Sequence, residues 1–211
     1  MPLTINSDAI RLAPLKYRGP LVSTIAKFEI QNLPEFLGTL YYESTYLTSL
    51  TENLNYTCDA LLKKYGRHRI SYNDAMRYGR RPGQAANQEA IANCIYGGKW
   101  GLKELGNKNL GDGWWYRGQG PIQLTGLYNW EAFSKYLKRP EIGLNPHIAL
   151  SDPQLVCDSA GWYWTELKDL NDCGSDMRAV TKLVTGAPDT AIKTRTVYRD
   201  TVRKLLPPGG L

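Results

Sequence analysis

The chain has 211 residues, of which 42% are hydrophobic and 22% are charged, and its formal net charge at pH 7 is +6. This composition indicates a globular chain, and it excludes an intrinsically disordered protein. It also excludes a membrane-spanning protein, because no apolar run approaches the length of a span.

The positive charge favours anionic partners. No nucleic-acid-binding motif and no dense stripe of Lys and Arg precede the C-terminal helix, so an interaction with nucleic acid would rest on charge alone. The four cysteines are widely spaced and form no C-x-x-C motif. We expect all four to be free, buried thiols; they are Cys58, Cys94, Cys157 and Cys173.

The two histidines of the chain, His68 and His147, lie in no metal-ligand motif. A zinc peptidase or amidase requires clustered His or Cys ligands, so neither is expected, and no metal or organic cofactor is predicted. A hydrolase built on Cys94 and His147 stays open as an alternative, although nothing in the local sequence favours it. The first twenty residues show no apolar signal segment, so we expect the protein to remain in the cytoplasm that makes it.

Taken in chain order, the predicted elements are mainly helices. Pro14, Gly19 and Pro20 are expected to punctuate a helix, a turn and a second helix within residues 1–32. The further helices expected are one capped by Asn32 with Pro34 and Glu35 in its first turn, one from Thr57 to near Gly66, one over residues 84–96, one from Thr125 to before Pro140, one from Asp152, one from Ser175 or Asp176 to Val184, and one from Thr190 to Leu206.

Two stretches between these helices are predicted to be loops. Residues 67–83 are polar and basic, and residues 99–120 combine dense glycines with several aromatic residues and are expected to form a long loop, with short strands at most. A loop of that length inside a compact domain is usually functional. The last helix carries Arg195, Arg199 and Arg203 at i+4 spacing, which we interpret as a solvated face, with contact to anionic surfaces as the alternative.

The helix after Asn32 carries a carboxylate on its apolar face. Phe36, Leu40, Glu43 and Leu47 share that face, which should point inward. A carboxylate buried without a partner is costly to ionise, so we expect Glu43 to hold its proton, as a general acid must. Glu52 follows in a polar, aromatic-flanked segment. Two carboxylates in unlike settings are typical of a glycosidase, although the pair also fits a rim residue and an ordinary surface charge.

A second group of polar side chains lies in residues 116–129. Gln123, Thr125 and Asn129 follow a tight Gly-Pro turn and are candidates to bind sugar or orient a water, while Thr125 also fits an N-cap and Asn129 an exposed first-turn residue. Aromatic rings suit carbohydrate because sugar rings present apolar C–H faces. The aromatic residues assigned to substrate binding, with core packing as the alternative, are Tyr56, Trp115 and Tyr116.

Four motifs stand in one order along the chain. They read Y-E-S-x-x-x-L-x-x-L-x-E-N-L-N-Y, A-I-A-N-C-I-Y-G-G-K-W-G, D-G-W-W-Y-R-G-Q-G-P-I-Q-L-T-G and D-P-Q-L-V-C-D-S-A-G-W-Y-W. In this order and spacing they resemble the family 19 chitinase-type endolysins of bacteriophages. The resemblance extends over nearly the whole chain.

The resemblance implies a mainly α, lysozyme-like fold with two lobes, a cleft and a small irregular or β portion. It implies one catalytic domain over residues 1–211, without a separate cell-wall-binding module, that hydrolyses β-1,4 links in an N-acetylated amino-sugar polymer. Glu43 matches the general acid of the family and Glu52 its second carboxylate. Thr125 matches the residue that helps to hold the nucleophilic water. The residues that match substrate-cleft positions are Gln123 and Asn129.

The chain departs from the family pattern at several positions. Tyr42 stands where His is usual, and Thr45-Tyr46 replaces Gly-Gly. Gln119 replaces an Arg, and Thr185 replaces an Asn. These changes leave the proton-transfer groups in place and bear on contacts with the substrate.

We therefore expect an inverting glycosidase in which Glu43 protonates the leaving oxygen and Glu52, with Thr125, activates a water, the two carboxyl groups being about 6.5–9.5 Å apart. The expected substrate is the glycan strand of peptidoglycan. The enzyme is expected to be a monomer that reaches the wall from the host cytoplasm during phage lysis and touches the anionic envelope weakly. The alternatives are a chitinase acting on N-acetylglucosamine polymers, a non-catalytic cell-wall-binding protein and a nucleic-acid-binding protein.

Overall fold

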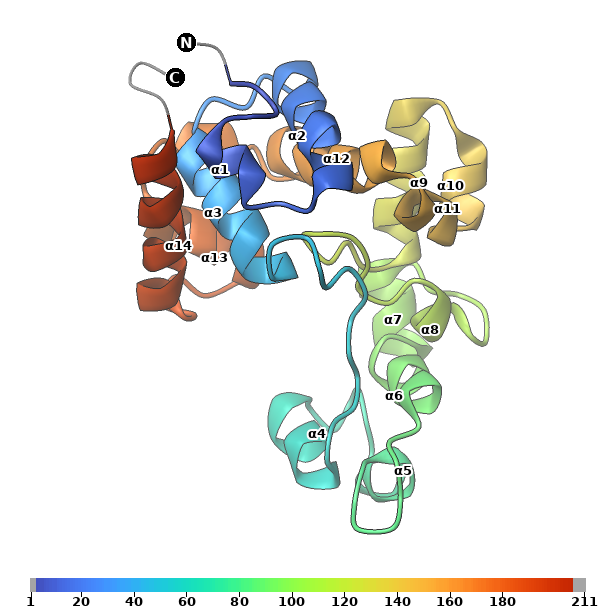
Figure 1. Cartoon of the computed structure of the whole chain (residues 1–211). Coiled ribbons are helices and arrows are strands. Elements are labelled where there is room, and N and C mark those ends of the chain that lie inside the picture. The colour runs from blue at the N-terminus through green and yellow to red at the C-terminus, as the bar shows by residue number, and fades with distance from the viewer. Residues whose placement is uncertain (1–2, 207–211) are drawn as a thin grey trace. The chain divides into compact units, whose positions relative to one another are not determined.

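The structure is a computed structural model that describes residues 3–206, and this part of the chain is almost entirely helical (Figure 1). In the described residues β structure is limited to isolated bridges, such as those of Gln119 with Thr51 and Leu124. Across the same residues no helix is long and apolar enough to cross a membrane. The predicted mainly α class is confirmed, while the ends of the predicted domain, residues 1–2 and 207–211, lie outside the described residues.

The chain divides into two compact units that alternate along the sequence. Unit 1 consists of Met1–Leu50, Gly120–Ile122 and Ala149–Leu211, and unit 2 consists of Thr51–Gln119 and Gln123–Ile148. Glu43 therefore belongs to unit 1, whereas Glu52, Gln123, Thr125 and Asn129 belong to unit 2.

Unit 1 is built on two pairs of packed helices. The helix α3 lies alongside α14, and α2 packs against α12 (Figure 1). A Cβ atom at Gly38 of α3 would lie 2.6 Å from Cα of Arg199, so only glycine allows α14 to approach this closely. The elements are α1 (Asp8–Arg11), α2 (Leu15–Lys27), α3 (Leu33–Ser44), α12 (Pro153–Trp162), the π-helix η1 (Tyr163–Leu167), the 3₁₀ helix η2 (Leu170–Cys173), α13 (Met177–Thr185) and α14 (Ile192–Leu205).

Polar residues begin several of these helices at the predicted positions. Asp152 and Asp176 each accept backbone N–H groups at the starts of α12 and α13. Asn32 also occupies an N-cap position, but its side chain does not cap α3. Instead its amide donates to the carbonyl of Leu170 at 2.9 Å and accepts from the indole of Trp164 at 2.9 Å, which ties the start of α3 to η2.

Unit 2 has a separate apolar core, in which Leu54, Leu61, Ile91 and Ile95 are fully buried. The helices that surround this core or extend from it are α4 (Cys58–Lys64), α5 (Tyr72–Tyr78), α6 (Gln88–Ile95), α7 (Gly98–Leu105), α8 (Asp112–Trp115), α9 (Leu127–Leu137) and α10 (Pro140–Leu144). The helix α11 (His147–Ser151) carries the chain from unit 2 to unit 1.

Several boundary predictions are wrong, each for a local reason. The helix α2 runs through Gly19 and Pro20, although Pro20 lies inside the helix, where a proline removes one backbone hydrogen bond. The predicted loop over residues 67–83 contains α5, whose N-cap Ser71 accepts from the backbone N–H of Asp74. The predicted loop over residues 99–120 contains α7 and α8, so its glycines begin and end short helices.

Candidate active site

Glu43 lies in the last turn of α3 and pairs with Arg195 of α14. The guanidinium donates to the Glu43 carboxylate from Nη2 and to the carbonyl of Thr190 from Nε, at 3.2 Å in the second case. It also lies 4.5 Å from the ring centre of Tyr42. The expectation that Glu43 is a lone carboxylate among apolar neighbours is wrong, because a buried cation lies beside it.

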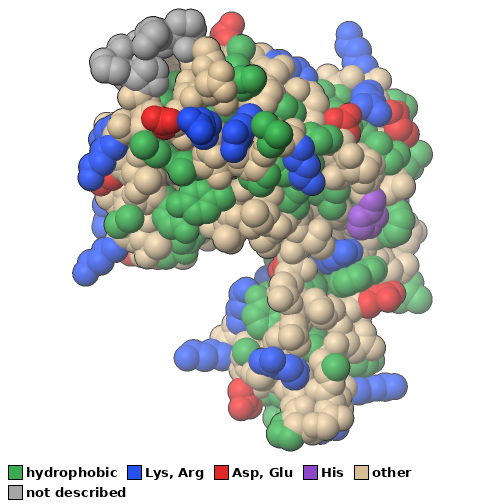
Figure 2. All heavy atoms as spheres, viewed as in Figure 1, with side chains coloured by type: hydrophobic (Ala, Val, Ile, Leu, Met, Phe, Trp, Pro, Cys, Tyr) green, Lys and Arg blue, Asp and Glu red, His purple; other side chains and the backbone are tan. Residues whose placement is uncertain are grey.

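Arg195 and Arg199 of α14 are turned toward α3 and away from water, whereas Arg203 is exposed but pairs with the same helix. Arg199 and Arg203 donate to the carboxylate of Glu35 at 3.3 and 2.7 Å, and Glu35 is 2% exposed. Glu35 therefore forms an ion-pair network and does not complete the predicted capping box. The interpretation of this stripe as a solvated face is wrong for Arg195 and Arg199, whereas Arg203 is exposed. On the face in Figure 2, Lys and Arg side chains are spread out and form no single stripe.

Glu52 is the second residue of unit 2 and is held by backbone and side-chain donors. Its backbone N–H donates to the carbonyl of Gly118 at 2.9 Å, and the N–H of Gly118 donates back to Oε2 of Glu52 at 3.2 Å. The hydroxyl of Tyr96, at the end of α6, lies 2.7 and 2.9 Å from the two carboxylate oxygens. Burial, followed by the charge of Glu52, raises the pKa of Tyr96, so this hydroxyl keeps the hydrogen that it donates.

Two guanidinium groups add positive charge around Glu52. Arg69 lies 3.7 Å from the ring centre of Trp100, and Arg117 lies 3.5 Å from that of Trp114. Burial lowers the pKa of both arginines, and the charge of Glu52 acts in the opposite direction on both. Glu52 thus lies in a polar setting, as predicted, but the groups that create this setting come from α6 and from segments far along the chain.

Gln123 brings the second group of polar residues to Glu52. A Cβ atom on Gly118 would meet Oε1 of Gln123 at 2.8 Å and Oε2 of Glu52 at 3.3 Å, so both polar ends converge on this glycine. The hydroxyl of Thr125 donates to the carbonyl of Gln123 at 2.8 Å, and the amide of Asn129 donates to the carbonyl of Thr125 at 2.7 Å. Thr125 is not an N-cap, because Gly126 holds that position in α9.

The three aromatic residues assigned to substrate binding have different settings. Tyr116 is buried, and its hydroxyl donates to the carbonyl of Gly143 at 3.1 Å. This agrees with the alternative that Tyr116 packs in the core. Trp115 is 39% exposed and donates from its indole to the carbonyl of Leu144 at 3.1 Å. Tyr56 is half-buried, and its hydroxyl accepts a hydrogen bond from the ammonium group of Lys64. Trp115 and Tyr56 therefore keep ring surface that a sugar can reach.

Comparisons with known proteins identify the family. No family model matches the chain. A protein of Haemophilus influenzae described as "Glycosyl hydrolase family 19 domain-containing protein" is 35% identical over 153 residues, which cover 72% of this chain and 68% of that protein. The chain belongs to glycoside hydrolase family 19. This family 19 protein is accordingly a glycoside hydrolase.

Solved structures share the fold of this family 19 hydrolase. Chitinase C from Streptomyces griseus HUT6037 superposes with a TM-score of 0.55 at 15% identity, over 94% of this chain and 73% of that chain. A class IV family 19 chitinase from Zea mays gives a TM-score of 0.54 at 13% identity, over 89% and 80% of the two chains. The agreement confirms a chitinase-like fold for the hydrolase.

Sequence reasoning missed Tyr96, Arg69, Arg117 and Arg195 in this family 19 hydrolase. Tyr96 lies within the motif A-I-A-N-C-I-Y-G-G-K-W-G, where its hydroxyl is a signal for a partner of a candidate carboxylate. The arginines of α14 recur at i+4 spacing, but such spacing alone does not distinguish a solvated face from a face of buried ion pairs.

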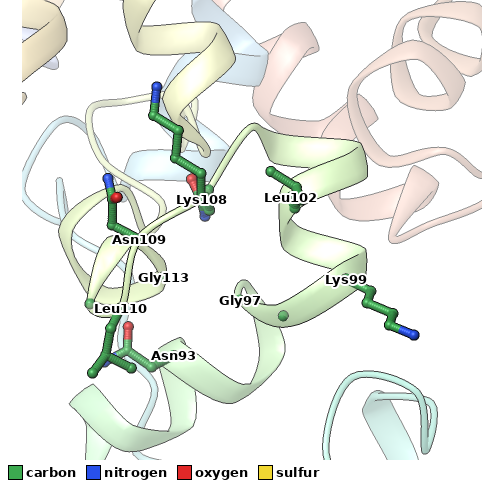
Figure 3. A pocket seen from close by; sticks show the side chains of 11 residues that line it. Asn93, Gly97, Lys99, Leu102, Lys108, Asn109, Leu110 and Gly113 are labelled. Carbon is green, nitrogen blue, oxygen red and sulfur yellow. The ribbon is translucent and has the colours of Figure 1, made fainter.

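A cavity of about 410 Å³ lies in unit 2, apart from the residues predicted to act. Asn93, Leu102 and Asn109 are among its lining residues, and Glu52, Gln123 and Thr125 are not. The ammonium ends of Lys99 and Lys108 point away from it (Figure 3). The cavity is therefore a feature of the surface of α7 and the following loop, and it does not collect charged groups.

The thiols do not form an alternative nucleophilic site. All four cysteines are free; Cys58 and Cys157 are buried as expected, but Cys94 and Cys173 are only half-buried. Burial raises the pKa of Cys94 to about 11, with a further contribution from Asp74, so its thiol is a poor nucleophile at neutral pH. Residues 3–206 contain no cluster of three or more His, Cys, Asp or Glu side chains that could hold a metal ion.

Proposed function

We propose that this family 19 hydrolase cleaves β-1,4 links in the glycan strands of bacterial peptidoglycan, with Glu43 as general acid and Glu52 as general base. The observation that carries the proposal is the contrast between the two carboxylates. Glu43 is oriented by a single buried guanidinium, that of Arg195, whereas Glu52 accepts hydrogen bonds from Tyr96 and Gly118. Two carboxylates held in unlike settings can serve as acid and base in one reaction.

In the proposed reaction, the carboxyl group of Glu43 gives its proton to the glycosidic oxygen while the bond from that oxygen to the anomeric carbon breaks. The carboxylate of Glu52 takes a proton from a water, whose oxygen bonds to the anomeric carbon from the opposite face. Arg195 fixes the direction of Glu43, and the acid role requires Glu43 to carry its proton once the glycan is bound. The oxygen of Thr125 keeps lone pairs that can accept a hydrogen bond from the water.

The choice of peptidoglycan is supported by the charge and by the motifs. A net charge of +6 suits a wall polymer that bears carboxylates better than a neutral polymer of N-acetylglucosamine. The four motifs resemble those of bacteriophage endolysins. We therefore propose that the protein is a monomeric lysin that acts on the wall after its release from the host cytoplasm, with weak contact to the anionic envelope.

A second candidate is chitin, and the solved structures favour it. The structural neighbours are chitinases by their descriptions, from Streptomyces griseus and Zea mays. Chitin and peptidoglycan share the β-1,4-linked N-acetylated backbone, so the same two carboxylates would act on either polymer. The substrates therefore have to be separated by experiment.

The test compares release of soluble sugar from purified sacculi and from colloidal chitin, at equal protein concentration. The proposal predicts faster release from sacculi, and a loss of at least about 100-fold in Glu43→Gln and in Glu52→Gln, because each variant removes one proton-transfer group. Glu104→Gln, which changes an exposed carboxylate of α7, is the matched control and should keep full activity. Release from chitin alone would favour the second candidate, and normal activity of Glu43→Gln would contradict the acid assignment.

A further inference from the structure

Three consecutive residues after α3 adopt left-handed backbone conformations. The φ angles are +49° at Thr45, +56° at Tyr46 and +64° at Leu47, and none of the three is glycine. A bulky residue in this region is strained, and such strain persists only where the surroundings hold it in place. Because this turn directly follows Glu43 and Ser44, the reason for a tyrosine at its centre bears on the site.

Hydrogen bonds hold this turn in place, and packing in the core holds Leu47. The N–H of Tyr46 donates to the carbonyl of Tyr41 at 2.9 Å, and the N–H of Leu47 donates to the hydroxyl of Ser44 at 2.8 Å. Leu47 is 2% exposed, so burial of its side chain offsets its strain. Tyr46 is only half-buried, and therefore the core does not account for its ring.

The ring of Tyr46 packs instead on a group of tyrosines beside the acid. It stacks on Tyr198 of α14, with 5.3 Å between ring centres and 27° between planes. Tyr198 meets Tyr42 edge to face at 5.6 Å. Tyr42 in turn lies under Arg195, the partner of Glu43. All of these residues belong to unit 1, so their arrangement does not depend on the placement of unit 2.

The tyrosines keep accessible surface. Tyr42, Tyr46 and Tyr198 are all half-buried, whereas Tyr41 beneath them is fully buried. On the face of unit 1 that Figure 2 shows, hydrophobic side chains are visible at the surface. Partly exposed rings that carry hydroxyls offer an apolar face with a polar edge, and this combination matches the C–H face and the hydroxyls of a pyranose ring.

We propose that Tyr46 and Tyr198 form a stacking subsite for one sugar ring of the glycan strand beside Glu43. The inference rests on the proposed function only in requiring a β-1,4-linked N-acetylated glycan as the ligand. It gives the Thr45-Tyr46 sequence a role in substrate contact, and it makes Tyr46 a residue that determines affinity for the strand.

The test measures binding of the β-1,4-linked tetramer of N-acetylglucosamine by calorimetry, in a Glu52→Gln background that stops hydrolysis and leaves unit 1 unchanged. Tyr46→Gly removes the ring and suits a positive φ, so the fold should be at least as stable, while the dissociation constant should rise roughly two- to ten-fold. Tyr46→Phe should restore affinity to within about two-fold of the parent, because the ring face carries the contact. Tyr198→Leu, a second variant that keeps the helix, should weaken binding similarly.

Thermal unfolding of each variant separates a binding role from a structural one. Tyr72→Ala, which removes an exposed tyrosine of α5, is the matched control and should bind as the parent does. Unchanged affinity in Tyr46→Gly and Tyr198→Leu, or no binding of the tetramer to the parent, would overturn the subsite. The tetramer contains the backbone that chitin and peptidoglycan share, so the result stands whichever polymer is the natural substrate.

Discussion

Arg195 of α14 donates a hydrogen bond to Glu43 at the end of α3, and this pair joins two helices that pack against each other in unit 1. The arginine side chain is 3% exposed and the glutamate side chain 22% exposed. Removal of a guanidinium this deeply buried leaves the Glu43 carboxylate without its charged partner. The pair therefore fixes the direction of the carboxyl group that we assign as the acid.

Replacement of Arg195 should harm both stability and activity. Arg195→Leu leaves Glu43 without its cation, and the free energy of unfolding should fall by about 2–3 kcal/mol, less than the ~3–5 kcal/mol of a fully buried pair because Glu43 keeps some contact with water. Urea unfolding of Arg195→Leu, Glu43→Gln and the double variant forms a thermodynamic cycle. The double variant should lose less than the sum of the single losses, and strictly additive losses would show that the pair is not coupled.

Tyr96→Phe tests the hydroxyl that donates to Glu52. The variant keeps the ring and removes one hydrogen bond to a charged group, so kcat should fall by roughly 10- to 100-fold, the equivalent of ~1.5–3 kcal/mol. Tyr78→Phe changes a ring that packs on the same core and is the control. Steady-state kinetics on soluble glycan fragments measure the effect, and an unchanged kcat in Tyr96→Phe would remove this tyrosine from the account of the base.

The assigned roles of Glu43 and Glu52 predict inversion at the anomeric carbon. Proton NMR of a fresh digest of a β-linked oligosaccharide should first show the α-anomer, with the β-anomer appearing only by mutarotation. The same mechanism requires about 6.5–9.5 Å between the two carboxyl groups in a complex with glycan, where a retaining enzyme has ~5 Å. An initial β-anomer would contradict the base role of Glu52.

The prediction of mainly helical structure rested on signals that act over a few residues. Thr57, Asp152 and Asp176 were expected to begin helices, and each accepts the backbone N–H groups expected of a cap. At Asn32 the local signal predicts the position but not the side-chain contacts. It has the cap position, but its side chain binds Trp164 and Leu170, which only the folded chain brings near.

For the candidate site too, local sequence identified some residues, and others are brought together only by the fold. Glu43 and Glu52 could be named from the sequence because a carboxylate on an apolar helix face and one in a polar segment differ visibly in their neighbours. The partner of Glu43 could not be named, since Arg195 lies 152 residues away along the chain. Similarly, the glycines of residues 99–120 indicated a loop, whereas Gly106 ends α7 with a left-handed residue.

Stability at high pH should depend on Tyr163 of η1. Burial, with a contribution from the charge of Glu43, raises the pKa of Tyr163 from 10.0 to about 12. Because the pKa in the folded state lies above that in the unfolded state, the stabilisation is complete below pH ~10 and is lost as the pH rises toward ~12. Urea unfolding between pH 8 and pH 12 should therefore show a shallower decline for Tyr163→Phe than for the parent. Equal slopes would contradict the assignment.

The central claim, hydrolysis of peptidoglycan strands by a carboxylate acid and a carboxylate base, is tested most directly by mass spectrometry of the products. Sacculi are reduced with borohydride, digested with the protein, and reduced again with borodeuteride so that only new reducing ends carry the label. The account predicts labelled muramic acid at the new ends. Labelled glucosamine would keep the mechanism and change the bond, whereas anhydro-muramic ends would exclude an attacking water and remove the roles of Glu52 and Thr125. The absence of any sugar cleavage, on sacculi that a known lysozyme digests, would contradict the claim as a whole.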